Sequence, residues 1–255
     1  MRALVISDIH ANLPALKAVL DAAPEHDAIW NLGDVVGYGA SPNEVVEMAR
    51  SLGGIVVRGN HDRACSDPDK FSQQSRMSPI AATAAIWTNQ VLTEENRKWL
   101  SGLPRGPVKP SRSKLICVHG SPRDEDEYIS SEWHAETSFT ALVAAGARIA
   151  FFGHTHEQIA LISTQRAFYP VEPEYPREGM VQFRLRLSRT SRYLLNPGSV
   201  GQPRDGDWRA AFAIYDSDQR SLTWYRVPYD VLTAQRRIRR AKLPEMLASR
   251  LQDGT

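Results

Sequence analysis

The sequence predicts an α/β fold, and two features of its pattern lead to this prediction. In the first half, short apolar runs typical of buried strands alternate with segments whose apolar residues recur at helical spacing. After residue 158 the chain becomes a succession of strand-like runs. The 255 residues, of which 42% are apolar, are sufficient for one substantial core. We therefore expect a single domain over residues 1–255.

The first half of the chain is expected to supply short strands joined by helices. Strands are predicted over residues 3–6, 28–32, 55–57, 114–118 and 148–152. Helices are predicted over 13–23, 42–52, 78–91, 93–101 and 137–145. Asn12 is a favourable N-cap for the first helix, and Ser41-Pro42-Asn43-Glu44 has the form of a capping box with proline at the first helical position. Residues 64–110 as a whole are a candidate capping helical segment.

The second half is expected to supply a further set of strands and a terminal helix. Strands are predicted over residues 159–164, 181–187, 192–195, 210–216 and 221–227. The proline-rich residues 169–176 predict a loop, and Asn196-Pro197-Gly198-Ser199 predicts a turn. Apolar residues at roughly helical spacing predict one C-terminal helix over 230–252.

Composition argues against several classes of protein. No apolar run approaches the roughly 18 residues that a membrane-spanning helix needs. The N-terminus lacks the layout of a signal peptide, and two cysteines make no disulfide framework, so we expect a cytoplasmic protein. The net charge is only +2, and the arginine runs at 184–192 and 236–240 are interleaved with apolar residues, as on solvated faces. Nucleic acid is therefore not expected as a partner. The oligomeric state, monomer or homodimer, is left open.

Five polar clusters, each at the end of a predicted strand, supply metal-ligand residues. They are Asp8-Ile9-His10, Gly33-Asp34, Gly59-Asn60-His61-Asp62, His119-Gly120 and Gly153-His154-Thr155-His156. Because the carboxyl ends of strands in open α/β sheets converge, these side chains can meet in one cleft. A bridging carboxylate, for which Asp34 is the candidate, would hold two divalent cations roughly 3.5–4 Å apart. The mixed oxygen and nitrogen donors suit Mn²⁺ best, with Fe²⁺, Co²⁺, Ni²⁺ or Zn²⁺ as alternatives.

The ordered set of clusters resembles the signature of the calcineurin-like metallophosphoesterases. Gly-Asp-Val-Val-Gly-Tyr-Gly at 33–39 and Asn-Pro-Gly-Ser-Val-Gly-Gln-Pro-Arg-Asp at 196–205 further resemble the small bacterial phosphodiesterase-like branch. The resemblance implies a four-layer α/β/β/α sandwich with two mixed sheets and the metals at one edge. It also implies a first ion held by Asp8, His10, Asp34 and His156, and a second held by Asp34, Asn60, His119 and His154. His61 would be the catalytic acid, supported by Asp62.

The implied activity is hydrolysis of a small phosphate ester, most consistent with a phosphodiesterase, by attack of a metal-bridging hydroxide. A phosphomonoesterase or a dinucleoside polyphosphate hydrolase is the alternative. A non-catalytic metal-binding scaffold for protein interaction is the alternative of another class, and the presence of His61 with every ligand argues against it.

Four further residues are candidates to line the cleft and contact a substrate phosphate or leaving group. They are Asn12, Tyr38, Arg63 and Arg204. Asn12 is equally well explained as a helix cap, and Arg204 as an ion-pair partner of Asp205 or Asp207.

Overall fold

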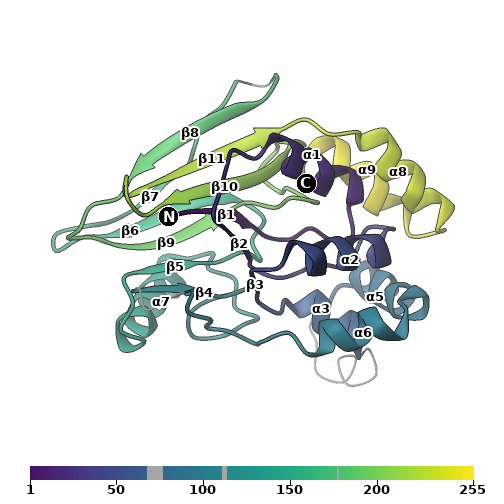
Figure 1. The fold of residues 1–255 in the computed structure, drawn as a ribbon, viewed down its shortest axis with the longest axis horizontal. Helices are drawn as coiled ribbons and strands as arrows, with labels where there is room; N and C mark the ends of the chain where they lie inside the picture. Colours follow the sequence, from purple (N-terminus) through teal and green to yellow (C-terminus); the bar gives the residue numbers. More distant parts are fainter. Residues whose placement is uncertain (68–76, 111–113, 177) are drawn as a thin grey trace.

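Two mixed β-sheets form the centre of the computed structural model, which describes residues 1–67, 77–110, 114–176 and 178–255 (Figure 1). The first sheet has the order β3 (Ile55–Val56), β2 (Ala28–Asn31), β1 (Arg2–Ile6), β10 (Ala210–Asp216), β11 (Ser221–Val227) and β8 (Val181–Arg186). The second has the order β4 (Leu115–Cys117), β5 (Ile149–Phe151), β9 (Arg192–Pro197), β6 (Gln158–Ser163) and β7 (Phe168–Val171). Strands β1, β2 and β3 are parallel, as are β4, β5 and β9, so their carboxyl ends point the same way within each sheet.

Helices cover the outer face of each sheet. One apolar core joins the first sheet to α1 (Leu13–Ala22), α2 (Pro42–Leu52), α3 (Asn60–Ser66), α5 (Pro79–Val91), α6 (Glu94–Ser101), α8 (Val231–Arg240) and α9 (Glu245–Asp253). A smaller core joins the second sheet to α7 (Glu132–Ala144). Trp87 and Trp99 pack against the larger core.

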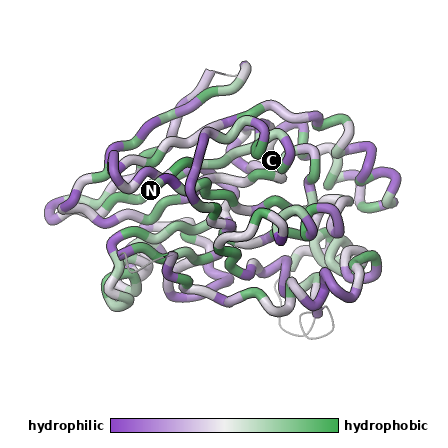
Figure 2. Tube along the Cα trace, viewed as in Figure 1, coloured by the Kyte–Doolittle hydropathy of each residue, from purple (hydrophilic) through white to green (hydrophobic). Residues whose placement is uncertain are grey.

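The alternation of side chains along the strands separates the layers. In β1, Leu4 and Ile6 face the helices, whereas Ala3 and Val5 face the core between the two sheets. In β9, Leu194 instead faces the core under α7. Hydrophobic residues accordingly follow the strands of both sheets (Figure 2). The four-layer α/β/β/α sandwich is thus confirmed.

Besides α7, which begins at Glu132 rather than at residue 137, three predicted elements differ from the structure. Residues 168–171 form the edge strand β7 rather than part of a loop, and Pro170 is tolerated there because an edge strand leaves some N–H positions unpaired. Asn196 and Pro197 lie inside β9 rather than in a turn. The expected single C-terminal helix is two helices, α8 and α9, which meet at Pro244 because proline cannot continue a helix.

The predicted capping box of α2 is also wrong. Ser41 makes no side-chain cap hydrogen bond, and its hydroxyl instead accepts a hydrogen bond from Arg237 Nη1 at 2.8 Å. Asn12, by contrast, caps α1 as predicted, because its Oδ1 accepts a hydrogen bond from Ala15 N at 3.3 Å. Within the described ranges, no helix is both long and apolar enough to cross a membrane.

Candidate metal centre

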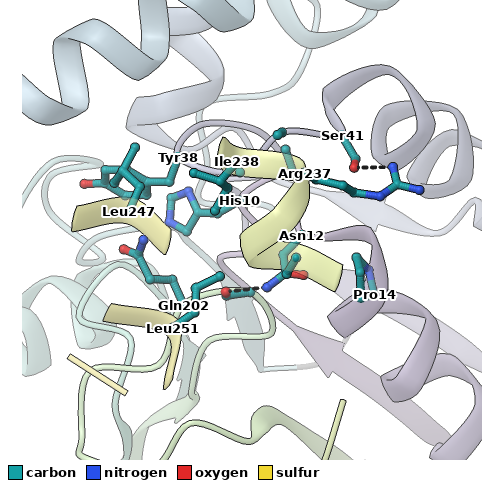
Figure 3. Close-up of a pocket in the computed structure, with 15 residues that line it drawn as sticks. His10, Asn12, Pro14, Tyr38, Ser41, Gln202, Arg237, Ile238, Leu247 and Leu251 are labelled. Carbon is teal, nitrogen blue, oxygen red and sulfur yellow. Dashed lines mark hydrogen bonds between the residues drawn. The ribbon is translucent and has the colours of Figure 1, made fainter. Parts of the chain in front are cut away.

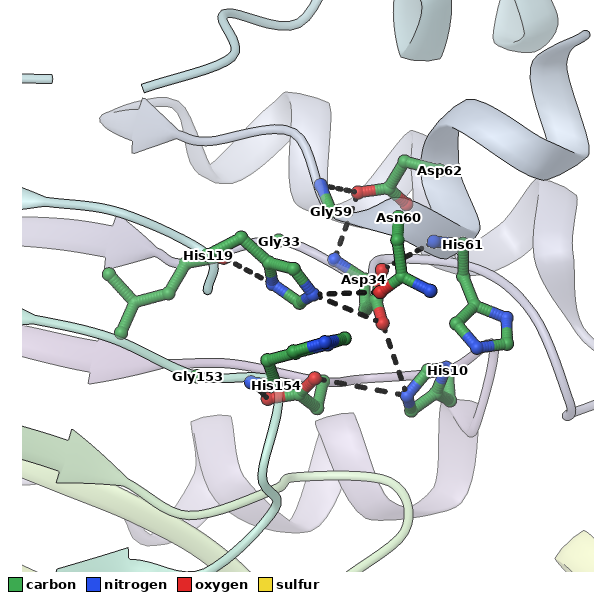
Figure 4. A network of polar contacts seen from close by, with 12 residues as sticks. His10, Gly33, Asp34, Gly59, Asn60, His61, Asp62, His119, Gly153 and His154 are labelled. Atoms are coloured by element: carbon green, nitrogen blue, oxygen red, sulfur yellow. Dashed lines mark hydrogen bonds and ion pairs between the residues drawn. The ribbon is translucent and has the colours of Figure 1, made fainter. Parts of the chain in front are cut away.

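The structure brings the five polar clusters together at one edge of the sandwich, from loops of both sheets (Figure 4). The first sheet contributes residues that follow β1, β2 and β3, which are Asp8, His10, Asp34 and Asn60. The second sheet contributes residues that follow β4 and β5, which are His119, His154 and His156. The convergence expected from the strand ends is therefore present.

These side chains form two groups that share one carboxylate. The ligand atoms of the first group lie within 4.8 Å of one another, and the group is Asp8, His10, Asp34 and His156. The second group meets the same limit and is Asp34, His119 and His154. Asn60 Oδ1 lies 3.1 Å from His119 Nε2 and so borders the second group. Asp34 is the residue common to both, which is the position a bridging ligand needs.

Backbone carbonyl groups fix the orientation of the imidazoles. Three rings bond through Nδ1, which turns Nε2 towards the centre: His10 to Val36 O at 3.1 Å, His119 to Leu32 O at 2.9 Å and His156 to Gln202 O at 2.6 Å. His154 has the opposite arrangement, because its Nε2 lies 3.2 Å from Asp126 O and its Nδ1 is left for the centre. Such outer contacts set the tautomer of metal-binding histidines.

Two unsatisfied carboxylate oxygens show that the residues fit divalent cations. Asp8 Oδ1 and Asp34 Oδ2 are buried and have no hydrogen-bond partner in the described part of the chain. Asp34 Oδ2 lies 3.4 Å from His119 Nε2, and Asp8 Oδ1 lies 3.2 Å from His156 Nε2. Because a buried carboxylate oxygen without a hydrogen bond is costly, a cation between these donors would remove a large penalty.

Burial and charge set the protonation of the imidazoles. Burial lowers the pKa of His10 and His156, and it lowers the pKa of His154 to about 3, so these rings are neutral and available as ligands at neutral pH. Burial acts in the same direction on His119, but the Asp34 carboxylate outweighs it and raises the pKa of His119 to about 10.

The loops that carry the site are held in uncommon backbone conformations. The φ angle lies between +49° and +67° at Asp8, His10, Asp34, His154 and His156. Such left-handed conformations are unusual for residues with a side chain and concentrate at functional sites.

Gly33 and Gly59 allow close approach of two loops, each for a different reason. Gly33 has φ +106°, and a Cβ there would lie 2.7 Å from Gly59 N. Gly59 has an ordinary φ of −93°, so a tight turn does not explain the glycine there. A Cβ at Gly59 would overlap Asp34 Oδ1, so glycine is required there because no side chain fits beside Asp34.

Asp62 does not orient the ring of His61, contrary to expectation. Its carboxylate accepts hydrogen bonds from three backbone N–H groups, of Asp34 at 2.9 Å, Gly59 at 3.0 Å and Val36 at 3.2 Å. Asp62 therefore holds the Asp34 loop against the first turn of α3. The ring of His61 is buried against Tyr38, with ring centroids 4.3 Å apart, and its Nδ1 has no partner among the described residues.

The four candidate substrate contacts divide into two pairs. Tyr38 borders the centre, since its ring lies 4.7 Å from that of His10 between centroids, and Arg204 lies beside it, with Nη2 3.5 Å from Tyr38 Oη. Asn12 lies behind His10, where its Nδ2 donates to Gly201 O at 2.9 Å (Figure 3). Arg63 is engaged in ion pairs with Glu125 at 2.6 Å and Asp126 at 2.8 Å.

Arg204 also lacks the ion pair that was its alternative explanation. Asp205 pairs with Arg226, and Asp207 pairs with Arg209. One residue of the site was missed from the sequence, namely Tyr128, whose ring lies 3.8 Å from that of His154 between centroids. It stands in a loop with no local motif, so no sequence signal marked it.

Comparison with known proteins agrees with this geometry. The sequence model of the calcineurin-like phosphoesterases matches residues 1–158, the part of the chain that carries all seven ligand candidates. This chain belongs to the calcineurin-like phosphoesterases. Membership makes the protein a metal-dependent phosphoester hydrolase.

Relatives of this phosphoesterase include well-covered structures and partial matches. A metallophosphoesterase structure from Sphaerobacter thermophilus is 41% identical, covers 100% of both chains and has a TM-score of 0.83. The uncharacterized protein MJ0912 of Methanocaldococcus jannaschii is 35% identical over 97% of this chain and 96% of its own. A symmetrical bis(5′-nucleosyl)-tetraphosphatase of Yersinia enterocolitica is 42% identical over 54% of this chain and 45% of its own. The chain thus spans less than half of that tetraphosphatase.

Proposed function

We propose that this phosphoesterase is a dinuclear enzyme that hydrolyses small phosphodiesters. The observation that supports the proposal is the pair of ligand groups that share Asp34. We propose that the first ion is held by Asp8, His10, Asp34 and His156, and the second by Asp34, Asn60, His119 and His154. The oxygen and nitrogen donors favour Mn²⁺. Bound there, the cations would supply Lewis-acid polarisation of the phosphoryl group and activation of a water nucleophile.

The chain's own residues would bind the phosphate and assist the leaving group. Arg204 is mostly buried, its Nε has no hydrogen-bond partner in the described ranges, and its Nη2 contacts only neutral oxygens, those of Tyr38 and Gln202. A guanidinium in that state next to a metal centre is suited to bind a phosphoryl oxygen. His61 lies beside His10, with ring centroids 4.9 Å apart, and would donate a hydrogen bond or a proton to the departing oxygen.

A dinucleoside polyphosphate hydrolase is the second candidate function. The similarity to tetraphosphatases of several Yersinia species, at 40–42% identity, favours it. Each of those matches covers only 54% of this chain, so the similarity does not extend to the remaining part.

The first experiment compares hydrolysis of three substrates in the presence of Mn²⁺: bis(p-nitrophenyl) phosphate, p-nitrophenyl phosphate and diadenosine tetraphosphate. Wild type would be assayed with Asp34→Asn and, as a matched control, with Asp21→Asn at an exposed position of α1. We expect preferred cleavage of the diester by wild type and Asp21→Asn, and loss of it in Asp34→Asn.

The other outcomes identify the alternatives. Preference for the monoester would make the protein a phosphomonoesterase, and preference for the tetraphosphate would select the second candidate. Two bound metal ions with no turnover of any substrate would support the non-catalytic scaffold.

A further inference from the structure

Tyr128 places an exposed aromatic ring directly against the candidate metal centre. Its ring and that of His154 are 3.8 Å apart between centroids, with an angle of 35° between their planes. Even so, 45% of Tyr128 is exposed to solvent. One part of the ring therefore rests on a candidate ligand while the rest is open to a bound molecule.

The loop that carries Tyr128 is held in place on both sides of the residue. Before it, Asp126 pairs with Arg63 at 2.8 Å, and the Asp126 carbonyl oxygen lies 3.2 Å from His154 Nε2. After it, Ile129 is buried in the core under α7. Because the ring is already positioned, a ligand that packs on it would lose little free energy to ordering the protein.

Arg204 lies between Tyr128 and a second tyrosine, Tyr38. Burial raises the pKa of the Tyr128 hydroxyl, and the nearby Arg204 guanidinium opposes that rise, while Arg204 Nη2 lies 3.5 Å from Tyr38 Oη. Within the described chain, no carboxylate lies within ion-pair distance of Arg204. An anion bound by Arg204 would thus have an aromatic ring on either side.

The two tyrosines face opposite halves of the centre. Tyr38 packs against His61 and His10, whereas Tyr128 packs against His154. His10 and His61 lie together on one side of Asp34, and His119 and His154 lie on the other (Figure 4). A leaving group assisted by His61 would depart on the Tyr38 side. The ester group that stays on phosphorus would then lie on the Tyr128 side.

We propose that Tyr128 is a specificity-determining residue that stacks on an aromatic group, such as a nucleobase, in the ester that hydrolysis retains. The proposal rests on the phosphodiesterase function proposed above. In the reaction, water adds to phosphorus, the bond from phosphorus to the leaving oxygen breaks, and that oxygen takes up a proton. The retained product would be a nucleoside monophosphate.

The test uses two diesters with the same leaving group and different retained groups. They are thymidine 5′-(p-nitrophenyl phosphate) and methyl p-nitrophenyl phosphate, each assayed with the Mn²⁺-loaded enzyme. We expect Tyr128→Leu to raise KM for the thymidine ester roughly ten- to hundredfold, the range that stacking on one base provides. The KM for the methyl ester should change by a much smaller factor, because a methyl group offers no ring to stack. Tyr128→Phe should keep the low KM, and Trp133→Leu, at an exposed aromatic nearby in sequence, should act as wild type.

Two results would overturn the inference. Equal loss for both esters in Tyr128→Leu would show that the residue only supports the centre, and an unchanged thymidine ester would show that no stacking occurs. If wild type hydrolyses neither ester, the proposed function fails. In that case the affinity of the metal-loaded protein for thymidine 5′-monophosphate tests the role of Tyr128. Weaker binding by Tyr128→Leu than by wild type would support stacking, and equal affinity would contradict it.

Discussion

In Asp8 and Asp34, one carboxylate oxygen accepts a hydrogen bond from a backbone N–H and the other faces the centre. Asp8 Oδ2 accepts a hydrogen bond from His154 N at 3.1 Å, and Asp34 Oδ1 accepts one from His61 N at 2.8 Å. The second oxygen of each, Asp8 Oδ1 and Asp34 Oδ2, faces the imidazoles without a partner among the described residues. Each carboxylate is therefore oriented by the loop of another cluster. The ligand groups are assembled as a unit rather than one by one.

Replacement of His61 by asparagine should separate catalysis from metal binding. We expect kcat for the aryl diester to fall roughly 10²–10⁴-fold, the usual contribution of a general acid. The variant has no imidazole that could donate a proton to the leaving oxygen. Metal content, measured by mass spectrometry, should stay at the wild-type level, since the His61 backbone N–H that holds Asp34 remains. His26→Asn, remote from the centre, is the control. A joint loss of metal and activity would show that the ring has a structural role.

A methyl group at Gly59 should displace Asp34 and empty both metal positions. In Gly59→Ala the new Cβ would overlap Asp34 Oδ1, and relief of such overpacking costs about 1–3 kcal/mol of the free energy of unfolding. Gly102→Ala is a matched control, because Gly102 also has negative φ and its Cβ would lie an ordinary 3.5 Å from Lys98 O. Metal content and thermal unfolding of both variants provide the measurement. Retention of metal by Gly59→Ala would contradict the explanation from space.

At the scale of single residues, the candidate metal ligands could be predicted from the sequence, whereas the roles of the residues around them could not. His10 and His156 were identifiable because each stands two residues from another ligand candidate after a strand. The role of Asp62 depends on which backbone N–H groups its oxygens meet, and two of the three, those of Asp34 and Val36, come from a loop 28 and 26 residues earlier. Tyr128 belongs to the site through a contact with His154 that no local pattern announces.

At the scale of elements, the two C-terminal helices support the loop that follows β1. Leu247 and Leu251 of α9 and Ile238 of α8 line a small cavity behind His10 (Figure 3). Arg237 of α8 ties this layer to the start of α2 through Ser41. The last part of the chain thus stabilises a loop formed by its first residues.

A pair of neighbouring positions on α9 tests this support. Leu247 is fully buried, so Leu247→Ala should lower the free energy of unfolding by roughly 2–5 kcal/mol. Met246 is 59% exposed, so Met246→Ala should change it by no more than about 0.5 kcal/mol. Urea titration of both variants measures the difference. Similar values for the two would mean that α9 does not contribute to the core.

Most elements could be predicted because helical and strand periodicity survives where one face is buried. Pro244 indicates the break between α8 and α9 in the sequence. The helical spacing of apolar residues over 230–252 nevertheless led to the prediction of a single helix. For strand β7 the sequence signal is misleading, because Pro170 indicates a loop except at the edge of a sheet. Whether a strand lies at an edge depends on the tertiary structure. The order of strands within each sheet is likewise set by packing rather than by local pattern.

At the scale of the whole molecule, the candidate ligands come from loops of both sheets. Asp8, His10 and Asp34 follow strands of the first sheet, and His119 and His154 follow strands of the second. The first group includes His156 from the second sheet, and the second group includes Asp34 from the first sheet, so an ion in either group would contact both sheets.

Removal of metal should therefore destabilise the entire sandwich. A ligand at a hundredfold excess over its Kd adds about 2.7 kcal/mol to the free energy of unfolding. We expect Mn²⁺ to raise the Tm of chelator-treated wild type and to leave the Tm of Asp34→Asn unchanged, as measured by calorimetry. An equal rise in both proteins would place the stabilising metal elsewhere.

Ions held by loops of both sheets would act as cross-links between the two sheets at one edge of the sandwich. A disulfide does the same with a covalent bond, but this link would be reversible and would depend on the concentration of free metal. The same ions would then hold the two sheets together and form the catalytic centre. Depletion of metal would shorten the lifetime of the folded chain at the same moment as it stops turnover.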